Sequence, residues 1–391
     1  MKKVYLTLSV FTALLSISAC QDNNSSDQQS SIIEEGVILR DCSIHRDDEF
    51  GGAYIDISIA DFNNLGFKFG DSLDLVFSND VTYTDIGYYS GYYVPAGQEL
   101  VVGYPGYDYI KFCINYGDDV YSMNNFNKDT RVTITVNQEQ KYRDIEETLS
   151  ISYSDDINEY PSKEEFANFR EIKVGYIKPG LLYRGASPID NRRKRAATVD
   201  GLLEENNIHY VIDLADKRST IYEMYEKEDF ASPYFQSLEG SGKVLALGMA
   251  AAYKTDDFAS KMRNMFLGIL YNNGPYYIHC LEGKDRTGYV CMVIEALCGA
   301  TYEELIDDYF ITYHNYYGIE KGTNKYDVIK ELHIDEMIRF VFDYGKETVL
   351  LGANYYSKAN NYLLSIGLTQ EDINAVQQKL MMEDSPRLSL G

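Results

Sequence analysis

Tryptophan is absent from this 391-residue sequence, whose aromatic content comes from 36 tyrosines and 17 phenylalanines. A tyrosine ring packs against apolar neighbours while its hydroxyl group stays hydrated. The composition therefore indicates tyrosine-rich sheets and interfaces, and it assigns no function by itself.

Basic residues are in short supply, with 36 Lys and Arg against 60 Asp and Glu and a formal net charge of −24. A chain this acidic repels nucleic acid, which excludes nucleic-acid binding as a main function. The same field opposes other anionic ligands. Any phosphate site must therefore depend on a local concentration of positive charge and oriented backbone dipoles.

Long apolar runs are missing after the first twenty residues, so no later segment is expected to cross a bilayer. The chain begins with Met1, Lys2 and Lys3, continues with an apolar stretch over residues 4–17, and ends this region at Cys20. These charged, apolar and small-residue zones are typical of a secretory signal. One interpretation of this region is an ordinary cleaved signal, in which Cys20 is present by chance.

The end of that region, residues 17–20 (ISAC), resembles the bacterial lipoprotein box, which implies that Cys20 is lipidated and becomes the first mature residue. Residues 1–20 are then a lipoprotein signal peptide, and the polar residues 21–35 a flexible tether. We expect the protein in the bacterial cell envelope, on the periplasmic or the cell-surface face. Its membrane contact would be through the lipid anchor only.

Cysteines are few, six in all. Cys42 and Cys113 either pair in an oxidising compartment or are two buried thiols, and their spacing does not decide between these alternatives. Cys291 and Cys298 are seven residues apart on an apolar helical pattern and are interpreted as core residues.

Residues 36–150 are predicted to form a small all-β domain, an antiparallel barrel or sandwich. Short alternating segments separated by Gly, Asn and Asp turns predict strands at 53–59, 72–77, 99–102, 109–113 and 131–136. No catalytic constellation is present there, and the role of the domain stays open. A run of tyrosines is interpreted as packing in preference to a binding face: Tyr83, Tyr88, Tyr89, Tyr92 and Tyr93.

Residues 151–391 have an α/β pattern. Apolar runs at 208–214 and 276–279 predict buried strands, and Thr255 is a good N-cap for a helix that continues to Tyr271. Residues 287–297 are apolar on nearly all sides, as expected of a helix inside the domain. Thr301 and Thr369 are each followed three residues later by an acidic residue, which predicts two capping boxes.

The segment 279–288 (HCLEGKDRTG) lies between a predicted buried strand and the start of a helix. Successive backbone N–H groups can face one concavity at such a place, with the helix dipole behind them. These dipoles and Arg286, with the neighbouring His279 as a further candidate, favour the thiolate of Cys280, which is a strong nucleophile. Arg286, six residues further on, offers a planar fork for two phosphoryl oxygens.

This motif resembles the cysteine-dependent protein tyrosine phosphatase superfamily, and its GKDRTG part resembles a bacterial branch that acts on phosphoproteins and phosphoinositides. Segments 168–170, 182–187 and 211–214 resemble upstream segments of that branch, in the same order. The resemblance covers about residues 160–380. It implies an α/β fold with a central, mostly parallel sheet flanked by helices.

The resemblance also implies roles for the motif residues. Cys280 is the nucleophile, Arg286 the phosphate clamp, and Thr287 a hydroxyl that steadies the thiolate. His279 and Gly288 support the loop. Phosphate is expected to contact Leu281, Glu282, Gly283, Lys284, Arg286 and Thr287. The chemistry requires no metal and no cofactor.

The general acid is less defined. Asp285, inside the loop, is the first candidate, followed by Asp213 and Asp216 after the strand, whose carboxyl groups could equally cap the strand end. The side chain of Glu282 is expected to face solvent.

The sequence has one basic cluster, at residues 192–195. With Arg184 it could form a second anion site for polyanionic head groups or phosphopeptides, built from Arg184, Arg192, Arg193 and Arg195. The alternative interpretation is a solvated helix start.

The function that these observations favour is a phosphatase acting on phosphotyrosine proteins and phosphoinositides through a phosphocysteine intermediate. An inactive phosphate-binding or surface-adhesion lipoprotein is the alternative. A sulfur-transfer enzyme is a third hypothesis, although such a loop would not need the Arg286-Thr287-Gly288 continuation.

Overall fold

The computed structural model describes residues 36–48, 50–95, 97–115, 117–386 and 388. The predicted signal peptide, the lipidation site Cys20 and the tether over residues 21–35 lie outside these residues. Among the described helices, none has both the length and the apolar character needed to cross a membrane.

Seven strands in the N-terminal part form a closed barrel, in the order β1-β2-β6-β5-β4-β3-β7. They are β1 (Ile38–Arg46), β2 (Ala53–Ser58), β3 (Ser72–Phe77), β4 (Thr82–Tyr89), β5 (Glu99–Val102), β6 (Tyr109–Ile114) and β7 (Arg131–Gln138). Neighbouring strands are antiparallel except β4 and β5, which run parallel. The barrel alternative is thus observed and the sandwich is not. Short helices accompany it: α1 (Ile59–Asn64), α2 (Val120–Met123) and α3 (Arg143–Leu149).

The barrel has its own apolar core. Tyr88 and Tyr89 are almost fully buried, so packing is the correct interpretation for these two members of the tyrosine run. Cys42 and Cys113 are both free thiols, but only Cys113 is buried, so the alternative of two buried thiols is correct for Cys113 and wrong for Cys42.

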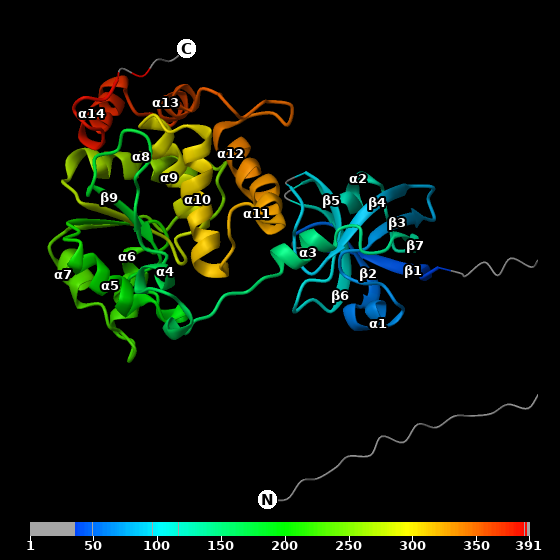
Figure 1. The fold of residues 1–391 in the computed structure, drawn as a ribbon. Coiled ribbons are helices and arrows are strands. Elements are labelled where there is room, and N and C mark those ends of the chain that lie inside the picture. The colour runs from blue at the N-terminus through cyan, green and yellow to red at the C-terminus, as the bar shows by residue number, and fades with distance from the viewer. Residues whose placement is uncertain (1–35, 49, 96, 116, 387, 389–391) are drawn as a thin grey trace, which may run out of the picture. The chain divides into compact units, whose positions relative to one another are not determined.

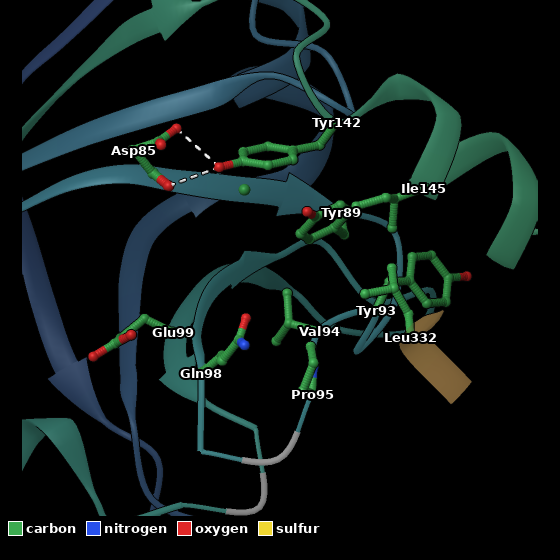
Figure 2. A pocket seen from close by; sticks show the side chains of 11 residues that line it. Asp85, Tyr89, Tyr93, Val94, Pro95, Gln98, Glu99, Tyr142, Ile145 and Leu332 are labelled. Carbon is green, nitrogen blue, oxygen red and sulfur yellow. Dashed lines mark hydrogen bonds between the residues drawn. The ribbon is translucent and has the colours of Figure 1, made fainter. Parts of the chain in front are cut away.

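A small pocket of about 120 Å³ lies in the barrel part, and its lining includes Tyr89, Tyr93 and Glu99. Figure 2 shows Asp85 accepting two hydrogen bonds from the Tyr142 hydroxyl group, one at its carboxylate and one at its backbone carbonyl. None of the predicted catalytic residues lines this pocket.

The C-terminal part is built on a five-stranded sheet with the order β11-β10-β12-β9-β8. The strands are β8 (Arg170–Glu171), β9 (Leu182–Gly185), β10 (Tyr210–Asp213), β11 (Val244–Ala246) and β12 (Tyr276–His279). All pairs are parallel except β8 with β9. This agrees with the predicted, mostly parallel sheet. The two central strands β10 and β12 end side by side, with Asp213 paired to His279.

Helices cover both faces of this sheet (Figure 1). Val211 and Tyr277 point into a cluster with α5–α7, while Ile212 and Ile278 point into the larger core with α8–α10. The helices are α4 (Lys163–Phe166), α5 (Ala196–Glu205), α6 (Arg218–Tyr225), α7 (Pro233–Gly240), α8 (Asp256–Tyr271), α9 (Asp285–Leu297), α10 (Tyr302–Tyr317), α11 (Asn324–Ile329), α12 (Asp335–Phe342), α13 (Tyr355–Ser365) and α14 (Gln370–Leu380). Single turns η1 (Ile157–Glu159), η2 (Asn191–Arg193) and η3 (Lys330–Ile334) complete the set.

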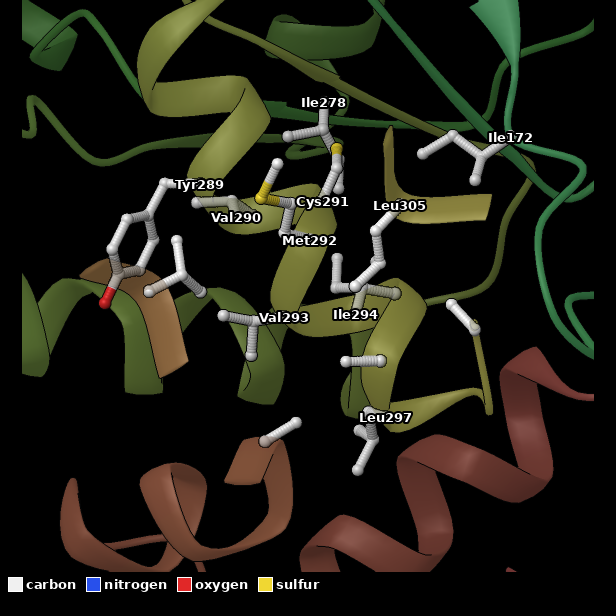
Figure 3. Packing of buried hydrophobic residues seen from close by; sticks show 14 of the residues in the cluster. Ile172, Ile278, Tyr289, Val290, Cys291, Met292, Val293, Ile294, Leu297 and Leu305 are labelled. Atoms are coloured by element: carbon white, nitrogen blue, oxygen red, sulfur yellow. The ribbon is translucent and has the colours of Figure 1, made fainter. Parts of the chain in front are cut away.

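Helix α9 is buried from Thr287 to its end, which is why it is apolar all round (Figure 3). Cys291 and Cys298 are fully buried core residues, as predicted. Thr255 caps α8, and the two predicted capping boxes at Thr301 and Thr369 are both present.

Three local predictions were incomplete. Ile59 begins α1 and does not extend β2, because Ser58 caps the helix by accepting a hydrogen bond from the backbone N–H of Asp61. Helix α9 begins at Asp285, two residues before its predicted start. Strands β1 and β4 were missed, and both contain a residue with positive φ, Asp41 or Asp85, that interrupts the alternation.

Candidate active site

The loop 280–284 connects β12 to α9, and its carbonyl groups all bond to the surrounding protein. The Leu281 carbonyl accepts from the Ser187 N–H at 3.0 Å. The Glu282 carbonyl accepts from the Asn168 amide at 3.1 Å and from the Tyr316 hydroxyl at 2.7 Å. Further contacts continue the pattern: Arg184 Nη2 donates to the Gly283 carbonyl at 3.1 Å, and the Gly288 N–H to the Lys284 carbonyl at 2.8 Å.

The backbone N–H groups of residues 281–286 have no hydrogen-bond acceptor among the described residues. With the carbonyls turned outward, these donors are left for a ligand. The first turn of α9 adds its dipole to the same place. The loop is therefore an anion cradle built from backbone groups, which suits a protein of net charge −24.

Gly283 allows this loop to close against β9. Its φ is +69°, and an added Cβ atom would lie 2.3 Å from the Gly185 carbonyl. Gly288 has a similar packing role in α9, where a Cβ atom would lie 2.1 Å from the Tyr309 ring. Both positions require the absence of a side chain.

Cys280 lies at the end of β12 and its side chain is buried. The Thr287 hydroxyl is also buried and has no hydrogen-bond partner within the described part of the chain. His279 is fully buried, its Nδ1 lies 3.2 Å from the Cys280 carbonyl, and burial lowers its pKa to about 4. His279 is therefore neutral near pH 7. It can orient the loop, but it supplies no positive charge to the thiolate.

Arg286 is oriented by a loop that follows β11. Its Nη1 donates to the Met249 carbonyl at 2.9 Å. The N–H of Met249 donates to the Leu214 carbonyl at 2.7 Å, and the N–H of Gly248 donates to the Asp216 carbonyl at 2.9 Å. One hydrogen-bonded network thus joins the guanidinium to the end of β10. No sequence pattern indicates this partner, because the donor and the acceptor are 37 residues apart.

The carboxyl groups of Asp213 and Asp216 lie at the end of β10. Asp213 Oδ1 accepts from the N–H groups of Ala215 and Asp216, at 2.9 and 3.0 Å. Burial raises the pKa of both carboxyl groups to about 7, and at Asp216 the neighbouring Asp213 adds to the rise. Both can hold a proton near neutral pH. Asp285, by contrast, is exposed at the first position of α9.

Lys284 points to an aromatic wall. Its Nζ lies 5.5 Å from the ring centroid of Tyr313 and 5.9 Å from that of Tyr317. Its backbone N–H belongs to the cradle. No group of three or more His, Cys, Asp or Glu residues suited to a metal ion exists within the described residues.

Glu282 does not face solvent, which corrects the prediction for its side chain. The side chain is only 22% exposed, and the Tyr153 hydroxyl donates a hydrogen bond to its Oε1. Arg193 Nη2 lies 3.6 Å from the same oxygen. No local sequence pattern could predict this contact, because Tyr153 precedes Glu282 by 129 residues.

The predicted second anion site is wrong for two of its four arginines. Arg184 is fully buried and pairs with Asp308 at 2.5 Å. Arg195 is 1% exposed and its guanidinium pairs with Asp155 at 2.8 Å. Both are committed to internal carboxylates, so neither can meet a ligand at the surface.

The other two arginines of the cluster are exposed to solvent. Arg192 pairs with Asp190 at 2.6 Å, and Arg193 lies beside Glu282. Their side chains are 69% and 42% exposed, so both are available at the surface near the loop.

The carbonyl groups of the phosphate loop are held in their outward direction by residues to which the sequence assigned no role. Asn168 lies in a segment recognised only by resemblance, and Asp308, in α10, holds both Arg170 and Arg184. Tyr316 lies two turns further along α10. Asp308 lies on the same face of α10 as Leu305 and other apolar residues. An acidic residue among apolar positions of a helix is the sequence signal that could have identified it.

Comparison with known proteins agrees with this geometry. A model of the tyrosine phosphatase family matches residues 162–382, more than half of the chain. The chain therefore belongs to the tyrosine phosphatase family, and it is an enzyme of the phosphatase class. No curated protein matches the sequence.

The solved structures that are similar to this chain include the core catalytic domain of the PP-IP phosphatase SIW14 from S. cerevisiae, in complex with citrate. It has 20% sequence identity and a TM-score of 0.26, and the match covers 44% of this chain and 90% of that one.

Proposed function

We propose that the protein hydrolyses phosphomonoesters through a phosphocysteine intermediate. The observation that carries the proposal is the loop in which outward carbonyls leave the N–H groups of residues 281–286 around Cys280. The Cys280 thiolate attacks phosphorus in line, the P–S bond forms, and the P–O bond to the leaving group breaks. Water then attacks the phosphocysteine, which releases inorganic phosphate and restores the thiolate.

Arg286 stabilises the charge on the equatorial phosphoryl oxygens, held in position by the Met249 carbonyl. The unpartnered Thr287 hydroxyl donates to the sulfur when it becomes the leaving group in the second step. Asp216, supported by Asp213, gives a proton to the leaving oxygen, because burial keeps it protonated near neutral pH. Asp285 is the alternative acid.

For substrates, we propose phosphotyrosine proteins and phosphoinositides. Arg192 and Arg193 support multiply charged substrates, since their exposed guanidinium groups lie close to the phosphate loop. The test compares kcat/KM for phosphotyrosine peptides, phosphoinositides and a small aryl phosphate between the wild type and an Arg192→Gln variant, which leaves the Arg193–Glu282 contact in place. A larger loss for phosphoinositides than for the aryl phosphate is expected, and equal losses would mean that Arg192 is a solvated surface charge.

We also propose that Cys20 carries a lipid anchor in a bacterial envelope. The support is the segment 17–20 (ISAC), which resembles the bacterial lipoprotein box. Metabolic labelling with an alkyne fatty acid should mark the wild type and not a Cys20→Ala variant.

The central test is turnover of a nitrophenyl phosphate. Cys280→Ser and Arg286→Ala should each lower kcat by a factor of about 10³ or more, whereas Cys280→Ser should still bind vanadate. A chelator should leave the wild-type rate unchanged. Vanadate binding without turnover in the wild type would favour the inactive phosphate-binding alternative, and thiosulfate turnover would favour sulfur transfer.

A further inference from the structure

Residues 153–155 lie ahead of the matched family region, which begins at residue 162, yet Tyr153 contacts the phosphate loop. We call these three residues the upstream strap. Its first member, Tyr153, donates a hydrogen bond from its hydroxyl to Glu282 Oε1. The Tyr153 ring stacks on that of Tyr316, with centroids 4.6 Å apart and an interplanar angle of 18°.

The strap is held by two arginines that follow β9 in the chain. Arg195 Nη2 donates to the Ser154 carbonyl at 2.8 Å, and its Nη1 pairs with Asp155 at 2.8 Å. The Arg195 guanidinium also lies 5.0 Å from the centroid of the Tyr153 ring. Arg193 covers the same ring at 5.1 Å and lies 3.6 Å from Asp155. Because buried Arg195 contacts all three residues of the strap, the strap has a defined position against the phosphate loop.

Glu282 explains why such a contact would matter for phosphate binding. It is a carboxylate two residues after the nucleophile, in a loop whose ligand is an anion. Like charges a few ångströms apart repel, and the repulsion is larger where water is partly excluded. A Glu282 side chain free to turn toward the cradle would therefore oppose the phosphoryl group. Its bond to Tyr153 and its proximity to Arg193 hold the carboxylate at the strap.

We propose that Tyr153 is a positioning residue of the active site, which fixes Glu282 and so keeps negative charge out of the anion cradle. The functional catalytic unit then begins upstream of the matched family region. This inference rests on the proposed phosphatase function. It predicts that the Tyr153 hydroxyl acts through Glu282 on the binding of phosphate and not on the chemical step.

The test uses the full chain, with Tyr153→Phe as the variant and Tyr160→Phe as its matched control. The Tyr160 hydroxyl also bonds to the strap: it donates to the Ser154 carbonyl at 2.6 Å and accepts from Arg195 Nη2 at 3.1 Å. Within the described part of the chain it forms no hydrogen bond with the phosphate loop. Tyr153→Phe should raise KM for a nitrophenyl phosphate roughly tenfold and change kcat by less than about twofold, because one hydrogen bond to a charged group is lost. Tyr160→Phe should leave KM unchanged.

Rescue separates positioning from a general loss of structure. Adding Glu282→Gln to Tyr153→Phe removes the charge that the strap restrains, so KM should return to within about twofold of the wild-type value. A wild-type KM in Tyr153→Phe would overturn the inference, as would a raised KM that Glu282→Gln does not lower. If the wild type shows no turnover, the proposed function fails by itself. The inference is then decided by vanadate affinity, which Tyr153→Phe should weaken and the double variant restore.

Discussion

At the scale of single residues, the proposed mechanism takes the proton for the leaving group from one of two neighbouring carboxyl groups, Asp213 and Asp216. Asp213 is fully buried and its Oδ1 is used by two backbone N–H groups, whereas Asp216 is 8% exposed and lies in the network that holds Arg286. The more accessible of the two is the better proton donor. Because they interact, any pKa measured in solution belongs to the pair.

The pH dependence of kcat follows from the direction of these shifts. Burial raises the pKa of Asp216 to about 7, so the proton is present below that pH and lost above it. We therefore expect kcat to fall as pH rises through about 7. Asp216→Asn should remove this falling limb and slow alkyl phosphates by a factor of about 10² or more, but nitrophenyl phosphate much less, because its leaving group departs readily as an anion.

Asp285→Asn is the control for this prediction. Its carboxyl group is exposed at the start of α9, and the variant should keep the falling limb. The reverse pattern, with the limb lost in Asp285→Asn and retained in Asp216→Asn, would identify Asp285 as the acid.

At the scale of elements, a buried ionic group joins β8, β9 and α10 beneath the phosphate loop. Asp308 pairs with Arg170 at 3.0 Å and with Arg184 at 2.5 Å. Burial alone would raise the pKa of Asp308, but the two arginines outweigh it and hold this pKa well below its usual range. Arg184 in turn binds the Gly283 carbonyl, so the group supports the outward direction of the loop.

Asp308→Asn should lower the free energy of unfolding by about 3–5 kcal/mol, because it removes the carboxylate that is closest to two buried guanidinium groups. The neighbouring Asp307 offers a matched control, since its pair with Lys321 is more than half exposed. Asp307→Asn should cost less than about 1 kcal/mol. Urea denaturation measures both values, and equal losses would contradict a structural role for the buried group.

The elements that were predicted correctly carry local signals. Thr255, Thr301 and Thr369 cap their helices through residues three positions away, and β12 is a short apolar run. The pairing of β1 with β7 shifts register between Leu39 and Cys42, so β1 does not alternate in the way a sequence pattern requires. Local propensity could not reveal this irregular strand.

Within the site, the nucleophile, the clamp and the loop glycines could be predicted because they lie in ten consecutive residues. The partners of that loop could not. Tyr153, Asn168 and Tyr316 reach Glu282 from three distant segments, and their contacts arise only when the sheet and α10 pack together. For the same reason Arg184 and Arg195 were predicted at the surface although both are buried.

At the scale of the whole molecule, the proposed function requires a chain of net charge −24 to bind an anion through the backbone N–H groups of residues 281–286. The barrel and the catalytic part each have separate apolar clusters. We therefore expect a chain of residues 151–391 to retain kcat/KM for nitrophenyl phosphate within about threefold of the full chain.

A shorter chain that begins at residue 162 keeps the matched family region but lacks the upstream strap. Its KM should rise, while its kcat stays close to that of the 151–391 chain. Steady-state kinetics of the two truncated chains make the comparison. Loss of all turnover in the longer one would contradict the independence of the catalytic part.

Rapid-quench trapping can detect the phosphocysteine intermediate itself. The enzyme is mixed with a ³²P-labelled aryl phosphate, denatured within milliseconds in alkaline detergent, in which the S–P bond survives, then digested at alkaline pH, and the labelled peptide is sequenced. A stoichiometric burst of label is expected on the peptide that contains Cys280, and no label in Cys280→Ser. Full turnover without labelled protein, or label on any other residue, would contradict the phosphocysteine mechanism.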